Sequence, residues 1–434
     1  MATTESWPDQ VLRAHARPMT TRDTIPSTGS SSRLRTDGPF GLPRTYWAIW
    51  TAVLVNRLAT FVQPFLVLFL VHEKGLSLAQ AGLVAAFLGV GAIVSSLVGG
   101  WLGDRLERRS AIVLGQSLAA LALLGLAAAP TTPLVVAGAL AVGLCSDLAR
   151  PAQNALVADV VAPEQRVRAY SLVFWALNLG FSVATLTAGV LSRFGYGWLF
   201  VVDAAATLLS ALLVVVLVPR MPRARRPYGP ATRGVVASMV RDPRAVTLVL
   251  AATAYATVYQ QAYSTLPLVM GRDGLSAAAY GAIVAVNGVV IVLLQPFAAG
   301  RIERWRPELV YATALVVVGA GFGLTVVAGS VATHLVAVIV WSVGEVGAAA
   351  VIGAMFAALA PPHQRSGYLA SFSLTFSVGM AVGPALGTWV LSRLGEPVLW
   401  LGSLALLVAA ALAVSRLHAP SADVPPPPAC AERG

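Results

Sequence analysis

The stretch Val190-Leu-Ser-Arg-Phe-Gly195 returns 200 residues later as Val390-Leu-Ser-Arg-Leu-Gly395. Other matches keep the same order and an offset of 196 to 200 residues; they include Gly75-Leu-Ser77 with Gly274-Leu-Ser276, Gly82 and Gly89 with Gly281 and Gly288, Arg105-x-Glu107-Arg108 with Arg301-x-Glu303-Arg304, and Pro163-x-Gln165-Arg166 with Pro362-x-Gln364-Arg365. Chance similarity between apolar segments does not keep such an offset. Repeats of this size are typical of membrane transporters, in which two similar units move about a site between them. The sequence therefore predicts a duplicated unit.

The composition predicts that this unit lies in lipid. Hydrophobic residues make up 57% of the chain and charged residues only 11%, against roughly a quarter charged in soluble domains. Roughly 20 apolar residues cross a bilayer as a helix. Twelve such stretches begin near residues 46, 79, 111, 134, 169 and 198, and again near 245, 278, 309, 333, 368 and 397. We therefore expect an all-α membrane protein with twelve transmembrane helices in two six-helix pseudo-repeats.

The placement of arginine predicts the orientation. Arginine is concentrated in both tails and in the linker between the halves, and cytoplasmic loops carry the excess of basic residues. We therefore expect a multi-pass protein of the cell (inner) membrane with both termini cytoplasmic, and a net charge of +11 that contacts anionic membrane lipids. A nucleic-acid partner has no supporting motif. The expected parts are a disordered tail (1–44), an N-terminal bundle (45–218), a basic linker (219–244), a C-terminal bundle (245–416) and a disordered tail (417–434).

The loop between spans two and three reads Gly100-Trp-Leu-Gly-Asp-Arg-Leu-Glu-Arg-Arg109. It resembles the loop motif of the major facilitator superfamily, G-x-L-x-D-R-x-G-R-R/K, and together with the repeat the resemblance covers residues 45 to 416. Glu107 stands where the family usually has glycine. The resemblance implies a secondary transporter that works by alternating access, with a cytoplasmic latch formed by Asp104, Arg105 and Arg108. The alternative is that the arginines only anchor the loop to lipid headgroups.

Span eleven carries a G-x3-G-P-x2-G pattern, formed by Gly379, Gly383, Pro384 and Gly387. A similar pattern sits in span five of facilitator antiporters, where this chain lacks it. The arginine that antiporters often place early in span four is also absent, since Ala139 stands there. The pattern predicts a kinked, closely packed helix with a role in gating, and ordinary helix packing is the alternative.

Polar and charged side chains interrupt a few of the spans. They are Asn56, Arg57 and Gln63 in span one, Asp147, Arg150 and Asn154 in span four, and Glu345 in span ten. An ionised group in hydrocarbon costs several kcal/mol and is retained mainly where it faces protein or water. The resemblance places spans one, four, seven and ten around a central cavity. It thereby implies one acid per half on that cavity.

These charges suggest a mechanism for coupling. Burial raises the pKa of a carboxylate and a nearby arginine lowers it, so an acid whose partner moves would bind and release a proton. We expect Asp147, Glu345 or both to carry a coupling proton, with Arg57 and Arg150 as opposing charges. A permanent ion pair of Asp147 with either arginine is the alternative. Glu345 has no arginine close in sequence and is the better candidate.

Span seven carries a tyrosine stripe of Tyr255, Tyr259 and Tyr263, flanked by Gln260 and Gln261. Together with polar and aromatic residues of neighbouring spans it predicts a roomy cavity for lipophilic or aromatic molecules, cations above all, rather than sugars. The expected substrate-binding residues are Asn56, Gln63, Asn154, Trp175, Asn178, Tyr255, Tyr259, Gln260, Asn287 and Trp341. The alternative is that the tyrosines form an interfacial belt.

Other chemistry has no signal in this sequence. It contains no G-x4-G-K-S/T loop and no clustered Cys/His site, so we expect neither an enzyme nor a cofactor or metal. The favoured interpretation is a monomeric, proton-coupled antiporter for efflux of small drug-like molecules, as in multidrug transport. An importer or facilitator of a small nutrient is the first alternative. A transport-inactive sensor or scaffold is disfavoured, because it would gain stability by replacing its membrane charges with apolar residues.

Overall fold

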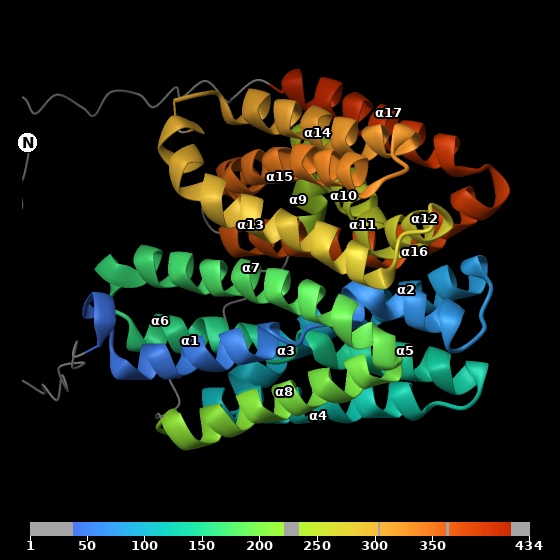
Figure 1. Ribbon diagram of the computed structural model, residues 1–434. Coiled ribbons are helices and arrows are strands. Elements are labelled where there is room, and N and C mark those ends of the chain that lie inside the picture. The colour runs from blue at the N-terminus through green and yellow to red at the C-terminus, as the bar shows by residue number, and fades with distance from the viewer. Residues whose placement is uncertain (1–37, 221–233, 303, 362–363, 418–434) are drawn as a thin grey trace, which may run out of the picture.

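The structure, a computed structural model, describes residues 38–220, 234–302, 304–361 and 364–417, and the described part is helical with no strand. The tails expected to be disordered lie almost entirely outside these residues, as does half of the linker. Two helical bundles lie one above the other in Figure 1. Both ends of the described chain lie on one side, which we call the arginine-rich face because the Arg105–Arg109 loop lies there too.

The N-terminal half contains six spans, two of which are broken. In chain order they are α1 (Arg44–Arg57) with α2 (Val62–His72), α3 (Leu78–Arg105), α4 (Arg108–Ala128), α5 (Thr132–Ser146) with α6 (Arg150–Val160), α7 (Arg166–Leu191) and α8 (Gly197–Leu217). Short 3-10 turns flank α7 on both sides.

A short surface helix, α9 (Val235–Arg241), leads into the C-terminal half. Its spans are α10 (Pro243–Tyr259) with α11 (Gln261–Ser264) and α12 (Leu266–Arg272), then α13 (Ala277–Ile302), α14 (Pro307–Leu324), α15 (Val331–Leu359), α16 (Arg365–Arg393) and α17 (Glu396–Ser415). Eleven stretches of the described residues are long and apolar enough to cross a membrane. The twelfth span is the one divided among α10, α11 and α12, so the twelve-helix fold expected from the sequence is confirmed.

The repeated Gly-Leu-Ser sequence marks the same turn in both halves. Gly75 and Gly274 have φ angles of 65° and 78°, a left-handed conformation that glycine adopts without a steric cost and that commonly ends helices. The serine two residues later caps the next helix. The Ser77 hydroxyl accepts from Gln80 N and the Ser276 hydroxyl from Ala279 N. The repetition thus reflects a shared way of ending one span and starting the next.

Each broken span has one break that is followed by a proline. A proline has no N–H, and its ring clashes with the carbonyl four residues earlier. Pro64, Pro151 and Pro267 each lie within the first turns of the helix that follows a break, namely α2, α6 and α12. Backbone groups freed at these breaks must find other partners at mid-membrane.

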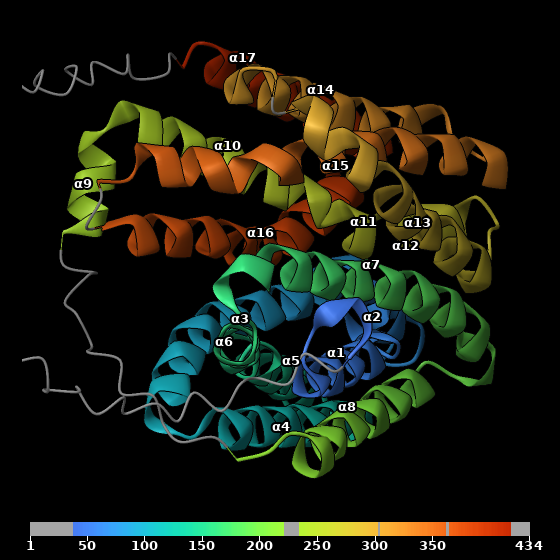
Figure 2. The same cartoon turned by 90° about the vertical axis from the view of Figure 1, so that its left-hand side faces the viewer.

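The two halves pack against each other on the side away from the arginine-rich face, where α3 contacts α16 and α7 contacts α13. Glycines bring these helices close. A methyl group on the glycine would lie 2.7 Å from Pro384 O at Gly82, 2.5 Å from Ala381 Cα at Gly89 and 2.7 Å from Asn178 O at Gly288. We call this contact the seam. Figure 2 shows α16 on the side of its bundle that faces α3 and α7.

Candidate functional site

Each half of the molecule contains a cavity, and the larger of these two, of about 420 Å³, lies inside the N-terminal half. All six spans of that half contribute to its wall, and Met380 of α16 closes it toward the other half. Its wall includes every polar residue that the sequence analysis selected in spans one and four: Asn56, Arg57, Gln63, Asp147, Arg150 and Asn154. The structure therefore brings these six residues together at one cavity.

Asp147 lies in the break between α5 and α6, where its Oδ1 accepts from Arg150 Nη2. Its own N–H donates to Ser95 Oγ at 3.2 Å, which fixes the break against α3. The side chain of Arg150 is 57% exposed and that of Asp147 21%. The partner of Asp147 in this conformation is thus Arg150, three residues away on the same span.

Asp203 of α8 is a site residue that sequence reasoning missed. It is buried, and its carboxylate accepts from Phe61 N at 3.2 Å and from Val62 N. These N–H groups lie at the start of α2, where the helix supplies no acceptors and has the positive end of its dipole; Phe61 N also donates to Ala59 O at 2.9 Å. The signal was present, because Asp203 is the one acid in the apolar run 197–217. It was missed because the expected cavity was assigned to spans one, four, seven and ten, and Asp203 lies in span six.

Asn56 supports the same arrangement. Its Nδ2 donates to Thr207 Oγ1 at 3.0 Å, and that hydroxyl lies 3.5 Å from Asp203 Oδ1. A chain of polar groups therefore ties α1 to α8 across the wall of the cavity. Asn56 is thus engaged within the protein in this conformation.

Arg57, the last residue of α1, projects into this cavity. Among the described residues no carboxylate lies within ion-pair distance of its guanidinium, although Asp147 and Asp203 attract it and Arg150 repels it. Gly180 of α7 packs directly against its main chain, and a methyl group there would lie 2.6 Å from Arg57 Cβ. The backbone of Arg57 is therefore held firmly while its charged end faces the cavity.

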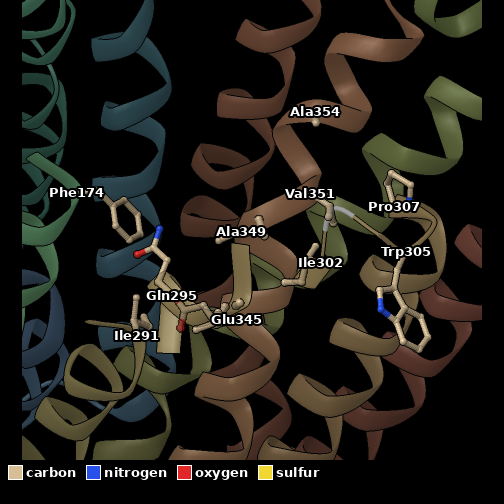
Figure 3. Close-up of a pocket in the computed structure, with 13 residues that line it drawn as sticks. Phe174, Ile291, Gln295, Ile302, Trp305, Pro307, Glu345, Ala349, Val351 and Ala354 are labelled. Atoms are coloured by element: carbon tan, nitrogen blue, oxygen red, sulfur yellow. The ribbon is translucent and has the colours of Figure 1, made fainter. Parts of the chain in front are cut away.

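The smaller cavity, of about 290 Å³, lies in the C-terminal half between α13 and α15, with Phe174 of α7 at one end and Trp305 toward the arginine-rich face (Figure 3). Glu345 is on its wall. The Glu345 carboxylate accepts from Asn287 Nδ2 at 2.8 Å and from the hydroxyl of Tyr259. No basic side chain of the described residues lies within ion-pair distance of it. Asn287, expected to bind substrate, also donates to Ser342 and so serves as a partner of the acid.

The tyrosine stripe packs inside the C-terminal half. Tyr255 is buried and stacks on Tyr259, and Tyr263 OH donates to Tyr259 OH at 2.9 Å. Trp341 is buried with its ring 4.2 Å from that of Phe322. In this conformation Tyr255, Tyr259 and Trp341 line neither the larger nor the smaller cavity. They therefore do not form the roomy aromatic cavity expected from the sequence.

The other predicted substrate residues lie elsewhere. Trp175 is 44% exposed on a face of α7 that also exposes Leu179 and Val183. Asn178 donates to Phe174 O of its own helix and packs at the seam. Gln260 lines a gap of about 20 Å³ between the halves, together with Gln63.

The predicted gating residues fall into two groups. Arg108 pairs with Asp159 of α6 at 3.6 Å, within the N-terminal half; Arg105 is exposed, and the side chain of Asp104 lies outside the described residues. The span-eleven glycines pack on the broken seventh span, Gly379 on Ala256, Gly383 on Gln260 and Gly387 on Gln261, while Pro384 lies inside a continuous α16. Close packing of these glycines is observed, and their part in gating stays a prediction.

Curated proteins similar to this chain are membrane transporters. The uncharacterized MFS-type transporter YttB of Bacillus subtilis is 24% identical over 85% of this chain and 93% of its own length. The multidrug resistance protein MdtH of an Enterobacter species is 26% identical over 78% of this chain and 85% of its own. A Na+, Li+, K+/H+ antiporter of Planococcus maritimus is 24% identical over 82% and 88%.

Solved structures share the fold. A peptide transporter POT in complex with sulfate superposes with a TM-score of 0.74 at 17% identity, over 88% of this chain and 96% of that one. A POT family transporter in complex with 5-aminolevulinic acid gives 0.74 at 14% identity, over 88% and 97%. The family model of the Major Facilitator Superfamily matches residues 49–276 and 248–432, which is most of the chain and one match per half. This protein therefore belongs to the Major Facilitator Superfamily and is a multi-pass membrane transporter.

Proposed function

We propose that this transporter couples the movement of protons to the export of small lipophilic or drug-like molecules by alternating access. The observation that carries the proposal is the placement of Glu345. It is an acid on a cavity wall at mid-span, hydrogen-bonded to Asn287 and Tyr259 and without a basic partner among the described residues. The multidrug and antiporter names of two relatives agree with this function.

Electrostatics explains why such an acid would carry a proton. An ionised carboxylate is costly in a low-dielectric site unless a positive charge balances it. Glu345 has hydrogen-bond donors but no such charge, so closing its cavity to water favours the protonated form. Opening the cavity to the arginine-rich face restores water and favours release. Proton binding and release would thus follow the movement of the two halves.

The shape of the molecule supports alternating access. The seam closes one face, while both cavities extend toward the arginine-rich face, the smaller one as far as Trp305. We take this face to be the cytoplasmic side of the cell (inner) membrane, because basic residues gather there. Both cavities are formed by a single chain, which supports a monomer as the functional unit.

Proton flux in proteoliposomes tests the proposal. Lipophilic aromatic compounds are screened as a cation (ethidium), a neutral molecule (2-naphthamide) and an anion (2-naphthoate), and at least one should move protons through the wild-type protein. Glu345→Gln should reduce this flux at least tenfold while leaving the protein folded and able to bind substrate. Glu164→Gln, which removes an exposed acid of a loop, is the matched control and should behave as wild type.

Three results would count against the proposal. Full proton coupling in Glu345→Gln would remove Glu345 from the mechanism. Uptake of a sugar without proton flux would indicate a facilitator. Inactivity toward every compound, with a folded protein, would favour a sensor or scaffold.

A further inference from the structure

Four polar side chains on the wall of the N-terminal cavity have no partner among the described residues. They are the guanidinium of Arg57 and the amides of Gln63, Gln153 and Asn154. Asn154 is exposed and the other three are half-buried, so water can satisfy them in this conformation and a ligand with oxygen acceptors can replace that water. Several unpaired groups that converge on one cavity are typical of a ligand site.

The acids of the same cavity are already satisfied. Asp147 is paired with Arg150, and Asp203 accepts from the backbone N–H groups that start α2 and lies beside the hydroxyl of Thr207. Among the charged groups of this cavity, the guanidinium of Arg57 is therefore the one whose N–H donors are free for a ligand. The remaining free groups, three amides, add N–H donors that suit the oxygens of an anion.

The rest of the wall is apolar. Ile49 and Val53 of α1, Leu88 of α3, Leu123 of α4 and Val142 of α5 contribute to it. The volume of about 420 Å³ lies within the range of small-molecule sites. A bare inorganic anion would leave these side chains in contact with water, whereas an organic molecule with one charged end would cover them.

We propose that this cavity is a subsite for amphipathic organic anions. The guanidinium of Arg57 binds a carboxylate or a similar monoanionic group, the amides of Gln63, Gln153 and Asn154 donate to its oxygens, and the apolar wall holds an aromatic or aliphatic body. Arginine suits this role because its fork of N–H groups matches a carboxylate and keeps its charge. The inference names a substrate class and rests on the proposed function for what happens to the bound molecule.

Cations are disfavoured at the same place. An ammonium group would meet Arg57 and Arg150 in one cavity, while both acids there are engaged with other groups. The two halves would then have separate duties, with the anion bound in the N-terminal half and the proton on Glu345 in the C-terminal half.

Three probes of equal size and different charge test the subsite: 2-naphthoate, 2-naphthamide and 2-naphthylmethylammonium. Their binding to the purified full chain in detergent is measured by equilibrium dialysis, with empty micelles as the blank. Naphthoate should bind at least tenfold more tightly than the amide or the ammonium probe. Arg57→Gln should abolish this preference, and Arg57→Lys should keep part of it because it keeps the charge.

Arg193→Gln removes an exposed arginine on the far side of the molecule and should leave the preference unchanged. Gel filtration and thermal melting verify the fold of each variant, and Arg57→Lys provides the measurement if Arg57→Gln does not fold. Equal binding of the three probes would overturn the proposal, as would a naphthoate preference that survives in Arg57→Gln. Preference for the ammonium probe would instead indicate a cation site at Asp147.

The two proposals fail separately, because dialysis uses no proton gradient. Glu345→Gln should keep the naphthoate preference. Loss of the preference in Arg57→Gln combined with intact proton coupling in Glu345→Gln would refute the proposed coupling alone. Absence of the preference in wild type, with coupling lost in Glu345→Gln, would refute only the anion subsite.

Discussion

The break in span one and the break in span seven occupy equivalent places in the two halves but are stabilised differently. In the N-terminal half an acid of another helix, Asp203, accepts the first N–H groups of α2. In the C-terminal half Gln261 lies within the break and donates to Thr257 O and Gly383 O. Ser403 stands 200 residues after Asp203, and its hydroxyl donates to Leu399 O of its own helix. The N-terminal half thus uses a charge where the C-terminal half uses an amide.

Spans four and ten show the same contrast. Pro151 follows the break that holds Asp147, whereas Val351 stands at the equivalent place and α15 runs unbroken past Glu345. Asp147 and Asp203 therefore have structural partners, an arginine and a backbone. Within the described part of the chain Glu345 has neither. The comparison suggests that Asp147 and Asp203 stabilise the breaks of the N-terminal half, whereas Glu345 of the C-terminal half is free to bind and release a proton.

Removal of the Asp203 side chain should produce the largest loss of stability. Asp203→Ala leaves Val62 N without an acceptor and Phe61 N with Ala59 O alone, and it removes the charged acceptor at the start of α2, so we expect the free energy of unfolding to fall by about 3 to 5 kcal/mol. Ser403→Ala, the matched change in the other half, should cost about 1 kcal/mol. Thermal unfolding in mild detergent measures both. Equal losses at the two positions would contradict the difference between the breaks.

Proline exchange tests the contrast between spans four and ten. Val351→Pro removes a helical hydrogen bond and adds a clash inside α15, so a loss of about 3 kcal/mol is expected. Pro151→Val, at a first turn that tolerates either residue, should change stability much less. The same unfolding measurement applies. Similar values for both variants would show that α15 accepts a break as readily as span four.

Added bulk at Gly383 should weaken the packing of α16 on span seven. A methyl group there would lie 2.6 Å from Gln260 Cβ and 3.0 Å from Thr257 O, and overpacking typically costs about 1 to 3 kcal/mol. Gly402 of α17 has open space around it, so Gly402→Ala is the control and should stabilise by about 0.5 to 1 kcal/mol through helix propensity. A Gly383→Ala protein as stable as wild type would show that span seven can shift to accommodate the methyl group at little cost.

The Asp147–Arg150 pair should have the smallest effect. The side chain of Arg150 is 57% exposed, and exposed pairs contribute only about 0.2 to 1 kcal/mol. A double-mutant cycle of Asp147→Asn and Arg150→Gln gives this coupling energy directly. A coupling above about 2 kcal/mol would mean that the pair is shielded from water and is a main support of the span-four break.

Much of the fold could be predicted because it depends on long-range sequence patterns. The offset repeats, the uninterrupted apolar runs and the loop at residues 100–109 each average over many residues, and each indicates the duplicated twelve-helix fold. The cluster of Arg57, Asp147, Arg150 and Asn154 was also accessible, because charges in a span are costly and few.

The details of the site depend on contacts that no local pattern contains. Tyr259 and Trp341 could line a cavity or pack on each other, and in the structure their ring centroids lie 6.5 Å apart, a contact between α10 and α15 that neither local sequence contains. Asp203 acts on α2, 142 residues away, and its role follows from the break in span one. Trp175 and Asn178 lie three residues apart on α7, yet one is exposed and the other lies at the seam.

The seam has a consequence for the energetics of transport. At Gly82, Gly89, Gly281 and Gly288 it brings a glycine against the main chain and small side chains of the opposite half. Such a surface carries no charge that must be rehydrated when it parts, so the closed and open conformers can lie close in free energy. A single methyl group at Gly82 or Gly281 would separate the two halves and shift the population of conformers, and neither glycine packs against a residue proposed to bind substrate or proton.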